Sequence, residues 1–425
     1  MKILVAHPAQ QHSYRLAEAL SGRGMLCAYA TTVYYKKHSL TALGAYFLRG
    51  TMKMKAQGRV SPVLRPEQVV QFCELEGLLK LLTMHVRFLR PLYRPIKYHT
   101  AERFARKVAR YAIREKVDAV VCYDDCSARL FAILSRKAPN ILRIMDVSAA
   151  SILYMKEIYE RDMALSPDFA ARLRQERAIV WDSGCQSRAR QELALSHYML
   201  APSGFVRTSL LYSGGKAEQI RLCPYGVDTG AFSCKPYDHE KEIRGRPVRF
   251  IYVGGVKELK GISYLLRGIM EIPPEQAQLT VVGKYDPGDR DTEPYGGRVQ
   301  FTGMVLHQEI PKLLREADVF VMPSLGEGMS LSALEAAACG LPLLVTENSG
   351  VGDAIKQGRE GFIIPIQSSE AIAAGMRWFI HHPERIEPMG RAARAMAQEY
   401  TWSRYQKRAS GLLRQLIEEA QACTP

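Results

Sequence analysis

Two glutamates eight positions apart, Glu327 and Glu335, carry the strongest chemical signal in this chain of 425 residues. The apolar run 319–323 precedes them, and a glycine flanks the first glutamate on each side. This order predicts a buried strand, a tight loop and then a helix over about 330–339, ended by a glycine and a proline. The first glutamate would lie in the loop, and the second about one and a half turns along the helix.

A helix that starts directly after such a loop leaves its first amide groups without partners in the helix. The amides of Gly328, Met329, Ser330 and Leu331 are therefore expected to bind an anion such as a phosphate or diphosphate. Ionised carboxylates beside that site only accept hydrogen bonds, which suits the hydroxyl groups of a ribose or a hexose. The alternative is a solvated loop and helix in which the spacing of the glutamates is incidental.

The elements that must position these residues alternate along the whole chain. Most strand-like runs are continuously apolar, as in parallel strands covered on both faces. This alternation predicts an α/β protein, and two open sheets fit its length better than a closed (β/α)₈ barrel. The expected strands are 2–7, 119–123, 141–146, 198–201, 219–223, 248–253, 278–282, 299–301, 319–323, 343–346 and 361–364, and the expected helices include 13–20, 102–115, 261–270 and 310–317.

A domain boundary is expected near residues 223–228, where a proline and a glycine follow a strand-like run. A polar stretch, 233–247, comes next. The end of the chain, from about residue 400, alternates basic and apolar residues and predicts a terminal amphipathic helix.

Several segments of the second half resemble the retaining glycosyltransferases called family 4 or group 1, which have the two-domain GT-B fold. The signature of that family is Glu-x₇-Glu, the spacing of Glu327 and Glu335. The resemblance is specific over about residues 200–425 and only general before them. Further similar segments are Pro-Tyr-Gly-Val-Asp at 224–228, Phe-Ile-Tyr-Val-Gly at 250–254, Lys-Gly at 260–261, Leu-Thr-Val-Val-Gly at 279–283, Val-Gln-Phe-Thr-Gly at 299–303 and Thr-Trp-Ser at 401–403.

The resemblance implies two Rossmann-like domains whose parallel sheets face each other across a cleft. Residues 1–223 would form the acceptor-binding domain, and 224–400 the domain that binds a nucleotide-sugar donor. The terminal helix, 401–425, would return to the first domain. The nucleotide sugar is then a substrate, and the family implies neither a metal nor another cofactor.

The resemblance also implies roles for individual donor-site residues. Glu327 would contact the hydroxyls of the donor sugar, Glu335 the donor ribose and Lys260 the diphosphate, with Glu327 and Lys260 as catalytic candidates. Relatives usually carry an arginine five residues before the lysine, but this chain has Gly255 there. Lys257 either substitutes for that arginine or is a solvated side chain. The other expected donor-binding residues are Gly254, Gly255, Gly283, Gly303, Met304, Gly328, Met329, Ser330 and Leu331; a core position is the alternative for Met304.

The turn after the first strand has a less specific sequence. It lacks the Gly-x-Gly-x-x-Gly fingerprint of dinucleotide-binding sites. Relatives turn this segment toward the acceptor, which implies acceptor-side positions for His7, Gln11 and His12, with His12 as a catalytic candidate. Helix capping and local hydrogen bonds in the loop are the alternative for all three.

Three aspartates follow expected strands of the first half. Asp146 stands where many relatives have a histidine, and a carboxylate at the carboxyl end of a strand suits a cleft, so we treat it as a further catalytic candidate. Asp124 and Asp125 either bind acceptor hydroxyls or cap the next helix. None of them has a partner at metal-ligand spacing.

Charge is distributed unevenly along the chain. The net charge is +15, and residues 1–110 hold 19 basic and 5 acidic side chains. Such a basic segment predicts an anionic partner: nucleic acid, anionic lipid or a phosphorylated substrate. Within it, residues 78–98 have apolar side chains on one helical face and mostly basic ones opposite, so this helix either contacts an anionic membrane or packs on the core with its basic face in water.

These features together predict a metal-independent hexosyltransferase that moves a sugar, with retention, from a nucleotide sugar to an acceptor hydroxyl. A basic first half suits a lipid-linked glycan in bacterial surface polysaccharide assembly, with a soluble acceptor as the alternative. Nine scattered cysteines and the absence of a long apolar run predict a cytoplasmic protein. The basic first half with its amphipathic helix favours peripheral contact with the inner face of the plasma membrane. The other candidate functions are a sugar-nucleotide 2-epimerase and a nucleic-acid-binding protein.

Overall fold

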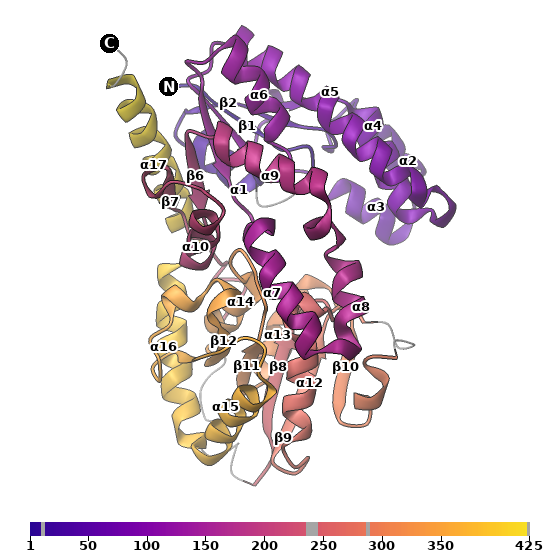
Figure 1. Cartoon of the computed structure of the whole chain (residues 1–425), viewed down its shortest axis with the longest axis vertical. Helices are drawn as coiled ribbons and strands as arrows, with labels where there is room; N and C mark the ends of the chain where they lie inside the picture. Colours follow the sequence, from indigo (N-terminus) through magenta and orange to yellow (C-terminus); the bar gives the residue numbers. More distant parts are fainter. Residues whose placement is uncertain (10–12, 235–244, 286–289, 423–425) are drawn as a thin grey trace.

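The computed structural model describes residues 1–9, 13–234, 245–285 and 290–422, which form two α/β domains arranged along the long axis of the molecule (Figure 1). The first domain contains a seven-stranded sheet and the second a six-stranded sheet. All paired strands in both sheets are parallel. The prediction of two open parallel sheets is therefore confirmed, and a single closed barrel is excluded.

The sheet of the N-terminal domain has the order β3-β2-β1-β4-β5-β6-β7. Its central strands are fully buried because helices cover both faces, which explains their continuously apolar sequences. The strands are β1 (Ile3–Ala6), β2 (Leu26–Thr31), β3 (Val69–Gln71), β4 (Ala119–Tyr123), β5 (Leu142–Asp146), β6 (Tyr198–Ala201) and β7 (Ile220–Leu222). The sequence pattern missed β2, which is rich in small residues, and β3, which has only three residues.

The sheet of the C-terminal domain has the order β10-β9-β8-β11-β12-β13. Its central strands β8 and β11 lie side by side, so the loops at their carboxyl ends meet at one edge of the sheet. The strands are β8 (Val248–Val253), β9 (Ala277–Val282), β10 (Val299–Gly303), β11 (Val319–Met322), β12 (Leu343–Thr346) and β13 (Gly361–Ile364).

Helices connect these strands, with short 3₁₀ turns between some of them. Those of the first half are α1 (Ser13–Ser21), α2 (Leu40–Phe47), α3 (Gly50–Gln57), α4 (Glu74–His85), α5 (Tyr93–Arg114), α6 (Ala128–Lys137), α7 (Ile152–Leu165), α8 (Pro167–Glu176), α9 (Ser183–Leu195) and α10 (Gly204–Tyr212). Those of the second half are α12 (Ile262–Met270), α13 (Ile310–Glu316), α14 (Leu331–Ala338), α15 (Ser369–His381), α16 (Ile386–Glu399) and α17 (Trp402–Ala422).

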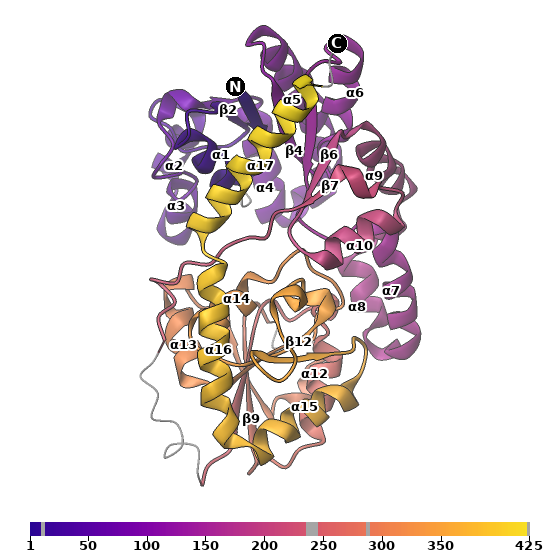
Figure 2. The ribbon, with the colours of Figure 1, turned by 90° about the vertical axis from the view of Figure 1, so that its left-hand side faces the viewer.

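The chain passes between the domains at two points that lie against each other. The amide of Val227 donates a hydrogen bond to the carbonyl of Tyr400 at 2.7 Å, and Val227 also bridges to Thr401. A Cβ atom on Gly226 would overlap the backbone of Thr401, so only glycine fits at this crossing. From there α17 runs along the N-terminal domain and packs on α1 (Figure 2).

Helices α7 and α8 belong to the first half of the chain but pack on the C-terminal domain (Figure 1). The hydroxyl of Tyr264 on α12 donates to Asp162 on α7 at 2.9 Å. Arg267, also on α12, pairs with Asp168 on α8 at 2.6 Å. The two domains are therefore connected by a helical pair as well as by the crossing at Val227.

None of the helices in the described ranges is both long enough and apolar enough to cross a bilayer. The eight cysteines in these ranges form no disulfide.

Candidate functional site

The carboxyl ends of β8, β9 and β10 carry three of the glycines expected at the donor site. Gly254 follows β8, Gly283 follows β9, and Gly303 ends β10. Gly283 has φ +148°, and a Cβ atom there would overlap the carbonyl oxygen of Gly254. Glycine therefore lets neighbouring loops meet closely at this edge.

The structure brings Lys260 and Glu327 into direct contact. Their side chains form an ion pair, and the hydroxyl of Ser324 donates to the same carboxylate at 2.8 Å. Both charged groups are largely, not fully, buried. The contact depends on Gly261, which has φ +71° and packs so tightly on Pro323 at the end of β11 that a Cβ atom would overlap the proline carbonyl.

The predicted strand, loop and helix around Glu327 are present, and α14 begins one residue later than expected, at Leu331. Ser330 caps the helix, and its own amide donates to the carbonyl of Ser349 at 2.9 Å. That amide is therefore not available to an anion, in contrast to the expectation. Gly328, Met329 and Leu331 supply the remaining amides at the start of the helix.

Glu335 on α14 lies at the same edge, where its carboxylate is 3.0 Å from Nε2 of His307. Burial raises the pKa of Glu335, and the nearby His307 partly opposes that shift. His307 was not expected at the site; it lies 28 positions from Glu335, and no motif marks it. Met304 is mostly exposed, so the core position considered for it is not observed.

The loop that contains Glu327 touches the N-terminal domain. Ser203 donates a hydrogen bond to the carbonyl of Gly328 at 2.6 Å. A Cβ atom on Gly328 would overlap the carbonyl oxygen of Ser148, and one on Gly326 would overlap the side chain of Met155. The residues around Glu327 therefore form part of the contact between the domains.

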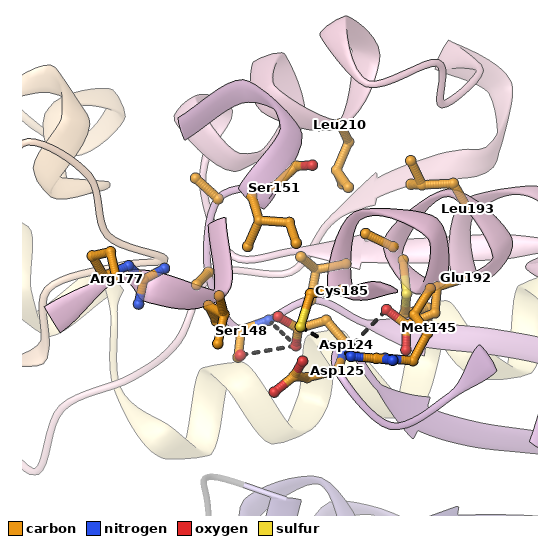
Figure 3. Close-up of a pocket in the computed structure, with 17 residues that line it drawn as sticks. Asp124, Asp125, Met145, Ser148, Ser151, Arg177, Cys185, Glu192, Leu193 and Leu210 are labelled. Atoms are coloured by element: carbon orange, nitrogen blue, oxygen red, sulfur yellow. Dashed lines mark hydrogen bonds between the residues drawn. The ribbon is translucent and has the colours of Figure 1, made fainter. Parts of the chain in front are cut away.

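A cavity of about 200 Å³ lies on the N-terminal side of this contact (Figure 3). It is bounded by the loops after β4 and β5 and by helix α9. Asp124, at the end of β4, accepts hydrogen bonds from the amide of Ser148 at 2.9 Å and from its hydroxyl at 2.8 Å. Burial raises the pKa of Asp124 to about 6. The expected acceptor-side residues Asp124 and Asp125 both line this cavity.

Glu192 on α9 also lines this cavity and was not expected there. Its carboxylate accepts hydrogen bonds from the amides of Ser127 at 2.9 Å and Asp125 at 3.2 Å. Glu192 therefore caps the start of α6 from a distant helix. The side chains of Asp124 and Asp125, for which capping was the alternative role, do not cap this helix. Burial, with the charge of Asp124 next, raises the pKa of Glu192 to about 7. Carboxyl groups that titrate near neutral pH in a cavity are suited to bind or exchange protons with hydroxyl ligands.

Arg177 lines the same cavity and lies apart from the carboxylates in Figure 3. It directly follows Glu176, whose carboxylate accepts from the amides of Leu259 at 3.3 Å and Glu258 at 3.4 Å, next to Lys260. Nε of Arg177 is buried and has no hydrogen-bond partner in the described part of the chain. Nothing in the local sequence marks this arginine, because its position depends on the packing of α8 against the segment Glu258–Lys260.

Of the other expected residues that the structure describes, His7 and Asp146 do not line the cavity. Gln11 and His12 lie outside the described residues. His7 is buried, with Nδ1 bound to the backbone of Ala9 and its ring edge-on to Tyr123 at 4.9 Å. Asp146 was predicted to face a cleft. It is only 3% exposed and lies among buried tyrosines, so it does not face an open cleft. Burial first and the Asp146 charge second raise the pKa of Tyr123, Tyr225 and Tyr405.

The described residues contain no cluster of three or more His, Cys, Asp or Glu side chains arranged to hold a metal ion.

Comparison with known proteins finds a family match in the C-terminal domain. Residues 247–382 match the family Glycosyl transferases group 1. Sulfoquinovosyl transferase SQD2 of Arabidopsis thaliana is 32% identical over 214 residues, which are 48% of this chain and 41% of that protein. The chain thus matches only about half the length of such curated relatives, or less.

Solved structures resemble the whole chain. Sucrose-phosphate synthase from Thermosynechococcus elongatus has a TM-score of 0.68 at 19% identity, covering 98% of this chain and 99% of its own. Anabaena HepE in complex with UDP has a TM-score of 0.63 at 16% identity, covering 98% and 100%. At these identities the likeness shows the fold alone. The chain therefore has the GT-B fold, and residues 247–382 of its C-terminal domain match the group 1 glycosyltransferases.

Proposed function

We propose that this chain is a retaining glycosyltransferase that moves a hexose from a nucleotide sugar to an acceptor hydroxyl, without a metal ion. The observation that carries the proposal is the contact of Lys260 with Glu327 beside the start of α14. In such a donor, the cation suits the diphosphate and the carboxylate suits the sugar hydroxyls. The helix amides suit the negative charge that develops on the diphosphate as it leaves. The complex of HepE with UDP supports a nucleotide ligand for this fold.

In the proposed reaction, the bond between the anomeric carbon and the diphosphate breaks as the acceptor oxygen bonds to that carbon from the same face. Lys260 and the amides of Gly328 and Met329 stabilise the charge that develops on the diphosphate. Glu327 orients the sugar through its hydroxyls, and Glu335 holds the ribose. The acceptor hydroxyl gives up its proton as its oxygen bonds to the sugar, and the leaving phosphate oxygen accepts it.

Arg177 is our candidate for the cation that Gly255 does not supply. Glu176 binds the amides just before Lys260, so the next residue along the chain lies beside the donor loop. The guanidinium of Arg177 is 5.7 Å from the ring centroid of Tyr159, and the charge of Glu327 is among the influences that raise the pKa of Tyr159 after burial. Lys257, by contrast, is exposed, although its side chain lies against Gly255.

The cavity that contains Asp124 and Glu192 is our candidate acceptor site. It adjoins Ser148, which contacts Gly328 of the donor loop, so an acceptor bound there would lie next to the donor. We propose a glycan acceptor, lipid-linked in bacterial surface polysaccharide assembly at the cytoplasmic face of the membrane, because the domain that would hold it is strongly basic.

The proposal is tested by thermal unfolding with UDP, GDP, ADP and their sugar conjugates. A nucleotide at about 100 times its dissociation constant stabilises the fold by about 2.7 kcal/mol. For a chain of this length, that corresponds to a rise in melting temperature of about 3 °C. We expect one nucleotide family to give this shift, and Glu335→Gln to reduce it.

Glu316→Gln is the matched control, because Glu316 is exposed on the neighbouring helix α13. Nucleotide sugars that stabilise the wild type are then assayed for release of the nucleoside diphosphate, which Glu327→Ala should abolish. The absence of a shift with every nucleotide would reject the donor site. Epimerised donor without diphosphate release would instead identify an isomerase.

A further inference from the structure

Exposed apolar side chains are concentrated in one short part of the chain. Of the 24 large hydrophobic side chains that are exposed among the described residues, fifteen lie between residues 40 and 98. Phe88 is 80% exposed, Tyr46 77% and Phe47 75%. Isolated apolar side chains are common on protein surfaces, but such a concentration indicates an interaction site.

Most of these side chains come from helices that pack on one another at one end of the N-terminal domain. Helix α2 contacts both α3 and α4, and α4 contacts the 3₁₀ segment Arg87–Leu92. An apolar groove of about 350 Å³ lies between the three helices. We call this region the α2–α4 face. It comprises residues 36–94, which include α2, α3, α4 and the 3₁₀ segment. Leucine and methionine residues dominate the groove: Leu48, Met52, Leu75, Leu78, Leu79 and Leu82.

The sequence pattern over 78–98 predicted a single amphipathic helix, but the structure divides it. Helix α4 ends at His85, a 3₁₀ segment follows, and α5 starts at Tyr93. Pro91 falls within the 3₁₀ segment, where it interrupts regular helical hydrogen bonding. As a result Phe88 points to solvent instead of packing on the core.

Basic side chains predominate on the α2–α4 face, whose acidic residues are Glu67, Glu74 and Glu76. Residues 19–66 contain no aspartate or glutamate, and none occurs from 77 to 101. Exposed basic side chains accompany the apolar ones: Lys37, Arg49, Lys55, Arg90 and Arg94. Apolar side chains in a field of uncompensated positive charge are typical of a surface that binds anionic lipid.

We propose that the α2–α4 face docks on an anionic lipid bilayer, with Tyr46, Phe47 and Phe88 inserted among the headgroups. A second copy of this chain is a poor occupant, because the face would meet its own positive charge. The docking proposal does not depend on the transferase activity. If the proposed function holds, docking places the protein at the surface where lipid-linked acceptors are. The face also lies near the second domain, because α3 is at the edge of the N-terminal domain that faces the other domain in both views (Figures 1 and 2).

The experiment is sedimentation of the full chain with two kinds of vesicle. One contains phosphatidylcholine alone, and in the other about a third of the lipid is phosphatidylglycerol, which supplies the anionic charge. We expect binding to the anionic vesicles that weakens as salt is raised. Each basic residue near such a surface contributes about fivefold, so Arg49→Gln/Arg90→Gln/Arg94→Gln should weaken partitioning about 100-fold. The apolar variant Tyr46→Ser/Phe47→Ser/Phe88→Ser should weaken it at least about tenfold.

Matched controls remove the same kinds of side chain from other exposed positions. Leu165→Ser/Leu222→Ser/Met270→Ser controls for lost apolar surface, and Lys216→Gln/Lys312→Gln/Lys356→Gln for lost charge. Both controls should bind like the wild type. No binding of the wild type to anionic vesicles would overturn the proposal, as would equal loss in the controls. A dimer that the apolar variant dissociates, without vesicle binding, would assign the face to a second copy.

Discussion

A buried pair of carboxyl groups connects α7 to the C-terminal domain and makes the stability of the fold depend on pH. Asp162 on α7 and Glu258 before Lys260 are both inaccessible to solvent. Asp162 accepts hydrogen bonds from Tyr264 at 2.9 Å and from Gln367 at 3.4 Å. Burial raises the pKa of Asp162 to about 6, and burial together with the charge of Asp162 raises the pKa of Glu258 well above its ordinary value.

The direction of the effect follows from where the proton binds. Between pH 3.8, the ordinary pKa of aspartate, and about 6, the folded state holds a proton on Asp162 that the unfolded state has lost. The free energy of unfolding therefore falls as pH rises through this window. A difference of about two pKa units corresponds to about 3 kcal/mol. Asp162→Asn keeps an oxygen that can accept from Tyr264 and removes the titration, so the variant should exceed the wild type by about that amount above pH 7 and match it near pH 4.

Urea unfolding from pH 4 to pH 8 measures this difference directly. Glu160→Gln is the control, because it removes one exposed carboxylate from the same helix. The quantity of interest is the free-energy difference between variant and wild type as a function of pH. If Asp162→Asn and the wild type change in parallel over the whole range, the buried carboxyl does not hold a proton in the folded state and the reasoning is refuted.

Two further predictions concern the crossing and the donor loop. Gly226→Ala forces a Cβ atom into the backbone of Thr401 and should lower the free energy of unfolding in urea by about 3 kcal/mol or more, whereas Gly411→Ala, with open space around it, should leave it unchanged or slightly higher. Arg177→Gln should lower kcat for diphosphate release about 100-fold, and Lys257→Gln should leave it near wild type; the reverse order would assign the second cation to Lys257.

The arrangement around Glu327 and Lys260 could be predicted from sequence because its parts are local. Strand β11, the loop with Glu327 and helix α14 follow one another within twenty residues, and each is marked by apolar runs or glycines. Lys260 precedes a glycine that the fold requires at a left-handed position. In parallel sheets, such loops meet at the carboxyl ends of neighbouring strands, so recognising each loop is enough to bring them together.

The cavity that contains Asp124 and Glu192 could not be predicted in the same way. It is assembled from separate segments, and Glu192 reaches it from a helix about 65 residues beyond the amides it binds. Asp146 was a reasonable choice from its place at a strand end, but Tyr225 and Tyr405 arrive from the domain crossing and from α17 and bury it. A pattern along one strand carries no information about which distant elements will cover its end.

The departure at Gly255 is best understood across the two domains. Arg172 on α8 donates to the carbonyl of Val256 at 2.9 Å, and Glu176 binds the amides of the residues before Lys260. The loop that would hold the diphosphate is thus supported by a helix from outside the segment that matches the family. Arg177 comes directly after that support, so the position of the cation that we propose in place of the missing arginine depends on α8 staying docked. Our proposal therefore couples donor binding to the contact between the domains, since whatever displaces α8 would also move Arg177.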